Sequence, residues 1–182
     1  MQTSYTATRK GFSLLEMMVA MGIFLVVVGL AVNILIQTLM LQRKSAAIQS
    51  VVDNTRFTLE LMTKEMRTGT SFSNASVCGV ASESGIEFET ADSQKRRYYF
   101  QGDNLMRLVG IDACANARPI NGDEVAIDQL GFILEGESTP PLDTDGQPYI
   151  TIFLRVRSRD PRFGPDTTMN LQTSVAARLR DL

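Results

Sequence analysis

The sequence predicts an α+β fold, in which a long N-terminal helix packs on an antiparallel β-sheet and the first half of that helix spans a membrane. Three features predict this fold: residues 17–41 are apolar and uncharged, a one-faced apolar pattern continues to Met66, and short segments of alternating polarity follow residue 85. Apolar residues repeating every three to four positions are typical of a helix, and apolar residues at every second position are typical of a strand.

The apolar run is long enough to cross a bilayer. Residues 17–41 would form a helix of about 37 Å, against a hydrocarbon core of about 30 Å. A helix that is apolar on all sides is either a membrane span or the core helix of a large protein, and 182 residues are too few for such a core. Arg9 and Lys10 favour a cytoplasmic N-terminus, whereas Arg43 and Lys44 at the far end favour the reverse.

Two other kinds of N-terminal segment are alternatives to a functional membrane-spanning helix. A secretory signal peptide has a shorter apolar region that ends in small residues, and residues 37–40, with the sequence QTLM, offer no such cleavage site. An uncleaved signal anchor fits the length but leaves Glu16 unexplained. A carboxylate at the head of an apolar run is costly, and by default it indicates function.

Residues 10–16, with the sequence KGFSLLE, resemble the cleavage and methylation signal of type IV prepilins and type II secretion pseudopilins. The family pattern is a short basic leader that ends in Gly, then Phe, with Glu at the fifth mature position. Here these residues are Gly11, Phe12 and Glu16. The resemblance implies a pilin-like fold and a prepilin peptidase that cleaves between Gly11 and Phe12 on the cytoplasmic face and methylates the new amino group of Phe12.

Physical chemistry gives Glu16 a role that agrees with this resemblance. After cleavage, Phe12 carries a cationic amine four residues before Glu16. Opposite charges at close range favour both charged forms and offset the cost of burying them. In the family the amine belongs to a neighbouring subunit, which implies that Glu16 sets the register of a helix joining a filament. The alternative is an ordinary flanking charge at the headgroup level.

Four segments are expected on this basis: a leader at 1–11, a transmembrane and filament-core helix at 12–41, its amphipathic continuation at 42–69, and an extracytoplasmic β-rich head domain at 70–182. The continuation carries an apolar stripe formed by Ile48, Val52, Thr55, Leu59, Met62 and Met66. We expect this stripe to pack on the chain's own sheet, with helix-to-helix contact in a filament as the alternative for its membrane-proximal half. Gly69 is the expected stop.

After Gly69 a polar loop is predicted at 70–85, and short strands follow it. The predicted strands are 86–90, 96–101, 105–109, 125–134, 149–157 and 171–177. The sequence Gly102-Asp103-Asn104 predicts a hairpin between two of them. Short turns between successive strands favour an antiparallel sheet.

Two observations distinguish a minor pilin from a major pilin. The segments 86–88, 97–100, 104–107 and 171–178 resemble minor pilin W and pseudopilin J. Many major pilins have a proline at the mature position of Asn33, whereas this chain has no proline between Phe12 and Thr68. Both observations favour a minor component.

Cys78 and Cys114 are the two cysteines, and a disulfide between them is expected if the head lies outside the cytoplasmic membrane, with free buried thiols as the alternative. The chain has no His, which excludes Ser-His-Asp and Cys-His catalysis and removes the commonest metal ligand. We therefore expect no enzyme activity, no metal and no cofactor.

The remaining candidate sites are weak. Residues 143–146, with the sequence DTDG, match the start of a calcium loop but lack its later acidic ligands, so an ordinary turn is preferred. Basic residues at 95–97 and at Arg155, Arg157, Arg159 and Arg162 are expected to be solvated surface. With a pI of about 5.2, nucleic acid is an improbable partner.

The preferred function is therefore a minor pilin that helps to initiate or cap a type IV pilus. A minor pseudopilin of a type II secretion system is the close alternative, and an adhesive or DNA-uptake module at the filament tip is an alternative of another class. The expected partners are other pilins or pseudopilins, prepilin peptidase and the inner membrane. The expected location is that membrane, crossed once with the N-terminus in the cytoplasm, and then the filament.

Overall fold

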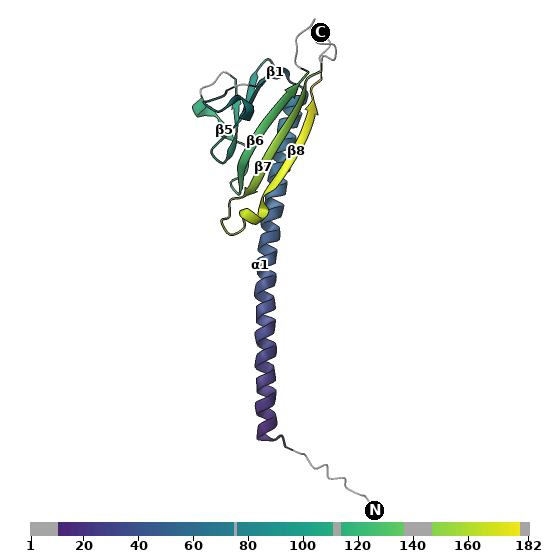
Figure 1. Cartoon of the computed structure of the whole chain (residues 1–182), viewed down its shortest axis with the longest axis vertical. Helices are drawn as coiled ribbons and strands as arrows, with labels where there is room; N and C mark the ends of the chain where they lie inside the picture. The colour runs from purple at the N-terminus through teal and green to yellow at the C-terminus, as the bar shows by residue number, and fades with distance from the viewer. Residues whose placement is uncertain (1–10, 75, 111–113, 137–146, 179–182) are drawn as a thin grey trace, which may run out of the picture. The chain divides into compact units, whose positions relative to one another are not determined.

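The computed structural model describes residues 11–74, 76–110, 114–136 and 147–178. The predicted leader, apart from Gly11, and the predicted turn at 143–146 lie outside these residues. The described elements are α1 (Leu14–Arg67), β1 (Thr70–Asn74), η1 (Ser82–Ser84), β2 (Gly85–Glu89), β3 (Lys95–Gln101), β4 (Asn104–Val109), η2 (Cys114–Asn116), β5 (Arg118–Pro119), β6 (Val125–Glu135), β7 (Tyr149–Ser158), η3 (Pro165–Thr167) and β8 (Met169–Ala176), as Figure 1 shows. The chain divides between Arg43 and Lys44 into two compact units. A long apolar helix followed by antiparallel sheets confirms the predicted α+β class.

The first unit contains the N-terminal part of α1. This helix is long and apolar enough to cross a membrane, and among the described residues none of its most apolar stretch is buried. The apolar side chains of Phe24, Leu25 and Leu30 are each at least 60% exposed. Because water is a poor solvent for such a surface, a membrane or other apolar helices must cover it.

The second unit, residues 44–182, contains two antiparallel sheets where the sequence predicted one. β1 to β5 form a five-stranded sheet in sequence order, and β6, β7 and β8 form a three-stranded sheet. Figure 1 shows the three long strands β6, β7 and β8 side by side. Alternation in β7 is as predicted, because Ile150, Ile152, Leu154 and Val156 are all buried. The hairpin between β3 and β4 is also confirmed, with Gln101 opposite Asn104 and Gly102 in the left-handed region at φ 60°.

The predicted loop at 70–85 was partly wrong, because it contains β1. This strand pairs with β2 and has a register shift between Thr70 and Ser73. Its sequence, TSFSN, has one apolar residue, Phe72, which is 1% exposed. A strand with a single buried residue shows no alternation, so its composition was indistinguishable from that of a loop.

The apolar stripe of α1 was placed correctly at Thr55, Met62 and Met66, which are buried, and at Leu59, which is partly buried against the core; it was wrong at Val52, which is 42% exposed. The buried residues of α1 are Val51, Thr55, Thr58, Met62 and Met66. Thr58 is accommodated in this face because its hydroxyl donates a hydrogen bond to the Asn54 carbonyl at 2.8 Å. A threonine can be buried on a helix when its hydroxyl is hydrogen-bonded to a backbone carbonyl of the same helix. A prediction from hydrophobicity alone does not identify such a residue.

Both sheets share one hydrophobic core with residues 51–66 of the helix. Stacked aromatic rings lie in it, with centroids 5.3 Å apart for Phe72 and Phe88 and 6.1 Å apart for Phe88 and Tyr98. Gly69 ends the helix against this stack, and a Cβ atom there would lie 2.6 Å from Phe88 Cδ2. The predicted stop at Gly69 therefore also serves close packing.

Candidate processing and assembly site

Gly11 and Phe12 lie in non-helical backbone immediately before α1. The helix begins at Leu14, and its first backbone bond runs from the Met17 amide to the Ser13 carbonyl at 3.2 Å. The Phe12 side chain is 80% exposed, and nothing lies within 4 Å of where a Cβ atom on Gly11 would be. A protease needs an accessible and unfolded peptide bond, and the bond between Gly11 and Phe12 meets that need.

Glu16 lies in the first turn of α1, and its side chain is exposed. The unpaired amide groups at a helix N-terminus favour a negative charge there. The helix thus supports a carboxylate at this position while leaving it free for a partner.

The few polar residues inside the apolar helix bond within it. Gln37 Nε2 donates to Asn33 Oδ1 at 3.3 Å, and the Thr38 hydroxyl donates to the Ile34 carbonyl at 2.8 Å. In hydrocarbon, an unpaired polar group costs several kcal/mol, and these internal bonds reduce that cost. The helix is therefore suited to an apolar environment along residues 17–41.

The comparisons with known proteins agree with this geometry. The family described as prokaryotic N-terminal methylation motif matches residues 6–32. Searches of the curated proteins and of the solved structures found no match to the chain. The motif indicates a substrate of prepilin peptidase of the type IV pilin or pseudopilin type, and the apolar helix that follows it suggests membrane anchoring.

A second group of residues fixes the helix to the head. Glu65 of α1 accepts a hydrogen bond from the Tyr98 hydroxyl at 2.7 Å and two from the guanidinium of Arg107. Arg96 Nε lies 3.8 Å from the same carboxylate. Burial and the bond to Glu65 raise the pKa of Tyr98, and the bond to Glu65 raises the pKa of Arg107, so both stay protonated at any physiological pH.

The sequence reasoning missed this group. Glu65 is 33 residues from Tyr98 and 42 from Arg107, and no local spacing joins them. One signal was available. Glu65 directly precedes Met66 of the predicted apolar stripe, so the sequence places a charged residue beside the apolar face of an amphipathic helix. In the structure Met66 is buried and the Glu65 side chain is only 18% exposed.

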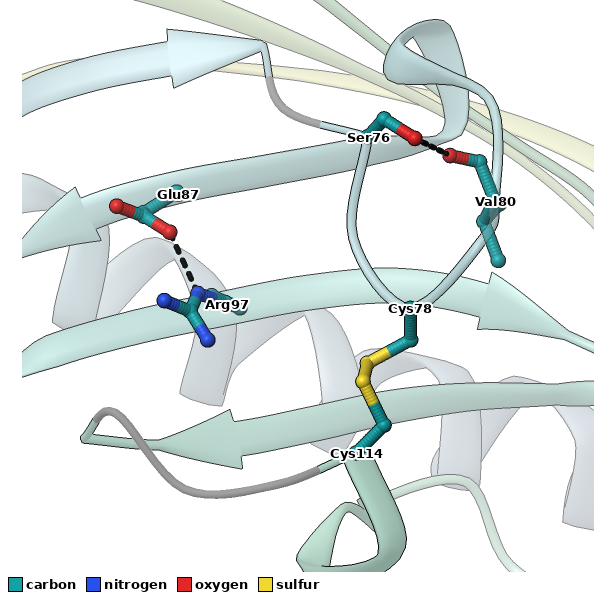
Figure 2. The surroundings of a disulfide bond; sticks show 6 residues. All are labelled: Ser76, Cys78, Val80, Glu87, Arg97 and Cys114. Atoms are coloured by element: carbon teal, nitrogen blue, oxygen red, sulfur yellow. Dashed lines mark hydrogen bonds and ion pairs between the residues drawn. A yellow bond between two sulfur atoms is a disulfide. The ribbon is translucent and has the colours of Figure 1, made fainter.

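The expected disulfide between Cys78 and Cys114 is present, with the two Cα atoms 5.7 Å apart. Cys78 lies in a turn at φ 55°, closed by a hydrogen bond from the Ser76 hydroxyl to the Val80 carbonyl at 2.8 Å (Figure 2). Beneath this turn Val77 packs with Tyr99 and Leu108 in a small second core. The disulfide fastens an otherwise thinly packed loop across the five-stranded sheet.

Replacing both cysteines, Cys78→Ser with Cys114→Ser, is expected to lower the free energy of unfolding of the head. Closing a loop of 36 residues contributes about 4 kcal/mol in the chain-entropy model. Urea unfolding of the full chain in neutral detergent, followed by circular dichroism, measures this loss. A reductant should reproduce it in the wild-type chain and leave the double variant unchanged. Equal unfolding midpoints for the two chains would contradict this role.

Most of the basic residues singled out in the sequence contact an acidic side chain. Lys95 and Arg97 both pair with Glu87 (Figure 2 shows the Arg97 pair), and Arg157 pairs with Asp128. Burial alone would raise the pKa of Glu87, but hydrogen bonds from Lys95 and Arg97 hold it below its ordinary value of 4.5. Residues whose charge is already paired attract phosphate weakly. Within the described ranges, no cluster of three His, Cys, Asp or Glu side chains is placed to hold a metal.

Proposed function

We propose that this chain is a minor pilin, cleaved after Gly11 and methylated on Phe12, that joins a type IV pilus through its N-terminal helix and acts near the initiating tip. One observation carries the proposal. The apolar helix of residues 17–41, which follows Glu16 and overlaps the methylation-motif match at residues 6–32, is exposed throughout in the described chain. Such a helix is soluble only in a bilayer or among similar helices, and a pilin exchanges the first environment for the second.

The mature chain would consist of a transmembrane and filament-core helix at 12–41, its amphipathic continuation at 42–69 and a head domain at 70–182 that lies outside the cytoplasmic membrane. Glu16 would pair with the Phe12 amine of a neighbouring subunit, and the pairing would fix the axial register of the entering helix. Since each charge is desolvated in a filament core, the pair is favourable when both members are present and costly when one is missing. The disulfide supports an oxidising location for the head.

The function is structural in this proposal, and the partners are other pilins, prepilin peptidase and the inner membrane. The paired states of Lys95, Arg97 and Arg157 disfavour a DNA-uptake module on these residues. A minor pseudopilin of a type II secretion system remains the second candidate, because the same signal and the same anchored helix serve both systems. A role among minor rather than major subunits is supported by the absence of proline at position 33.

Deletion of the gene, followed by filament counting and quantitative mass spectrometry of sheared filaments, tests this proposal. We expect few filaments of ordinary appearance in the deletion strain, restoration by the wild-type gene, and a content of this chain far below that of the main subunit. If the chain is the main subunit of the filaments, the minor role is wrong. If filament numbers are unchanged and secretion of periplasmic proteins stops, the pseudopilin alternative is correct.

A further inference from the structure

β8 forms one edge of the three-stranded sheet, whose strand order is β6, β7, β8. It pairs with β7 along its whole length of 8 residues without a register shift. In an edge strand, every second residue directs its backbone N–H and C=O groups away from the sheet. Across the ranges that the structure describes, no backbone hydrogen bond reaches this outer edge.

The other three edge strands have features that hinder pairing with a further strand. β1 is short and has a register shift, and β5 consists of Arg118 and Pro119. β6 has a register shift between Ile127 and Gln129, and the Ile127 amide donates to the Asp103 carbonyl. Proteins commonly protect edges by shortening, irregularity, charge, proline or cover. β8, with the sequence MNLQTSVA, has no charge, no proline and no irregularity.

A groove of about 450 Å³ lies beside this edge, between β8 and the helix. Val52, Thr55 and Leu59 line it from α1, and Met169, Leu171 and Thr173 line it from β8. Leu59, Met169 and Leu171 are three of the half-buried residues that pack against the main core, and Val52 is 42% exposed. The core between helix and sheet is therefore left open along β8, at the position that a further strand would cover.

The occupant that fits this place is an extended polypeptide segment. A strand paired with β8 would satisfy its outward backbone groups and would direct every second side chain into the groove. Met169, Leu171 and Thr173 of β8 line the groove. A strand that pairs beside them therefore needs apolar side chains at its positions i, i+2 and i+4. Arg56 and Glu60 also line the groove, and their opposite charges give no preference for a charged segment.

A second copy of this chain does not fit. Among the described residues, a second copy would have to present one of its own edge strands, and β1, β5 and β6 carry the obstacles described above, so its β8 is the edge left for pairing. Antiparallel pairing of two β8 strands places a two-fold axis perpendicular to the sheet, and residues 44–67 of the two helices then run in opposite directions. Because residue 43 precedes Lys44 in the chain, the two copies would enter their heads from opposite ends of such a dimer, whereas copies anchored in one membrane, as proposed above, enter from the same side.

We propose that the β8 edge and the adjacent groove form a docking site for an extended segment of a different protein, which adds to the sheet as a fourth strand. Its inward side chains, apolar at every second position, complete the core between α1 and β8. This site uses residues 52–63 of α1 and β8, and none of its lining residues belongs to the apolar segment 17–41 through which the chain is proposed to join a filament, so it would attach another polypeptide to the head.

A fluorescent peptide with the sequence of residues 149–157, YITIFLRVR, is a suitable probe because its apolar side chains alternate as required. The experiment uses the full chain in neutral detergent and measures binding by anisotropy. The peptide should bind and should slow amide hydrogen exchange in residues 169–176. A peptide of the same composition with the alternation scrambled should not bind. Two further peptides carry N-methyl groups at alternate backbone nitrogens, one at the odd positions and the other at the even positions. The peptide whose methyl groups block the nitrogens that face β8 should lose binding, and the other should retain it.

Matched variants locate the peptide in the groove. Val52→Lys places a charge in the groove and should weaken binding at least about tenfold, a loss of about 1.4 kcal/mol. Phe57→Lys adds the same charge at a position that is 64% exposed and outside the groove, and it should leave binding unchanged. The proposal is overturned by absence of binding, by protection outside β8, by equal effects of the two lysines, or by a dimer whose β8 amides are protected without peptide.

Discussion

A chain carrying Glu16→Ala is expected to be cleaved and methylated normally but to be largely absent from filaments. Processing depends on the accessible bond between Gly11 and Phe12, which the substitution leaves unchanged. Assembly would then bury the Phe12 amine of a neighbouring subunit without a counter-charge, at a cost of about 3 kcal/mol for a charge in hydrocarbon. Because about 1.4 kcal/mol corresponds to a factor of ten, incorporation should fall by about a hundredfold.

The measurement compares this chain in sheared filaments with the same chain in the membrane fraction. Glu60→Ala is a matched control, because it removes the same side chain from an exposed position of the same helix. We expect the control to assemble as the wild type does. Normal piliation and normal secretion with Glu16→Ala would contradict the proposal that the pairing of Glu16 with the Phe12 amine fixes the axial register of the helix in the filament.

Glu65→Ala is expected to cause a large loss of stability of the head. It leaves the Tyr98 hydroxyl and the Arg107 guanidinium without their partner, and Tyr98 is fully buried. Removing one member of a buried charged pair costs about 3 to 5 kcal/mol, and partial exposure of Arg107 places the expected value at about 3 kcal/mol.

Urea unfolding of the full chain in neutral detergent measures this loss, with Glu60→Ala again as the control. The control should change the free energy of unfolding by less than about 0.5 kcal/mol, as is usual for an exposed site. A second variant, Tyr98→Phe, removes one hydrogen bond and should cost about 1 kcal/mol. A value for Glu65→Ala no larger than that of the control would show that the group does not hold the helix to the sheet.

Local patterns predicted the elements that bury a regular face. The apolar run before Arg43, the alternation in β7 and the turn at Gly102 each depend on neighbours in sequence, and each was predicted correctly. The methylation motif was recognisable for the same reason, since Gly11, Phe12 and Glu16 lie within six positions.

Features that depend on distant contacts could not be predicted. Thr58 entered the core and Val52 left it, because the sheets decide which side of the helix is covered. The link between the two sheets is also non-local: the Asn121 side chain accepts a hydrogen bond from the Leu105 amide at 3.0 Å and donates one to the Val125 carbonyl at 2.7 Å, and so joins β4 to β6. Glu65 likewise finds its partners only after the chain has folded.

Cleavage of the bond after Gly11 would leave a mature subunit that begins with the apolar helix and its Glu16. Mass spectrometry of the intact chain purified from its native membrane tests it most directly. The expected result is a polypeptide that begins at N-methylated Phe12 and retains every residue after it. A chain that still carries residues 1–11, or one cut beyond residue 41, would contradict the account.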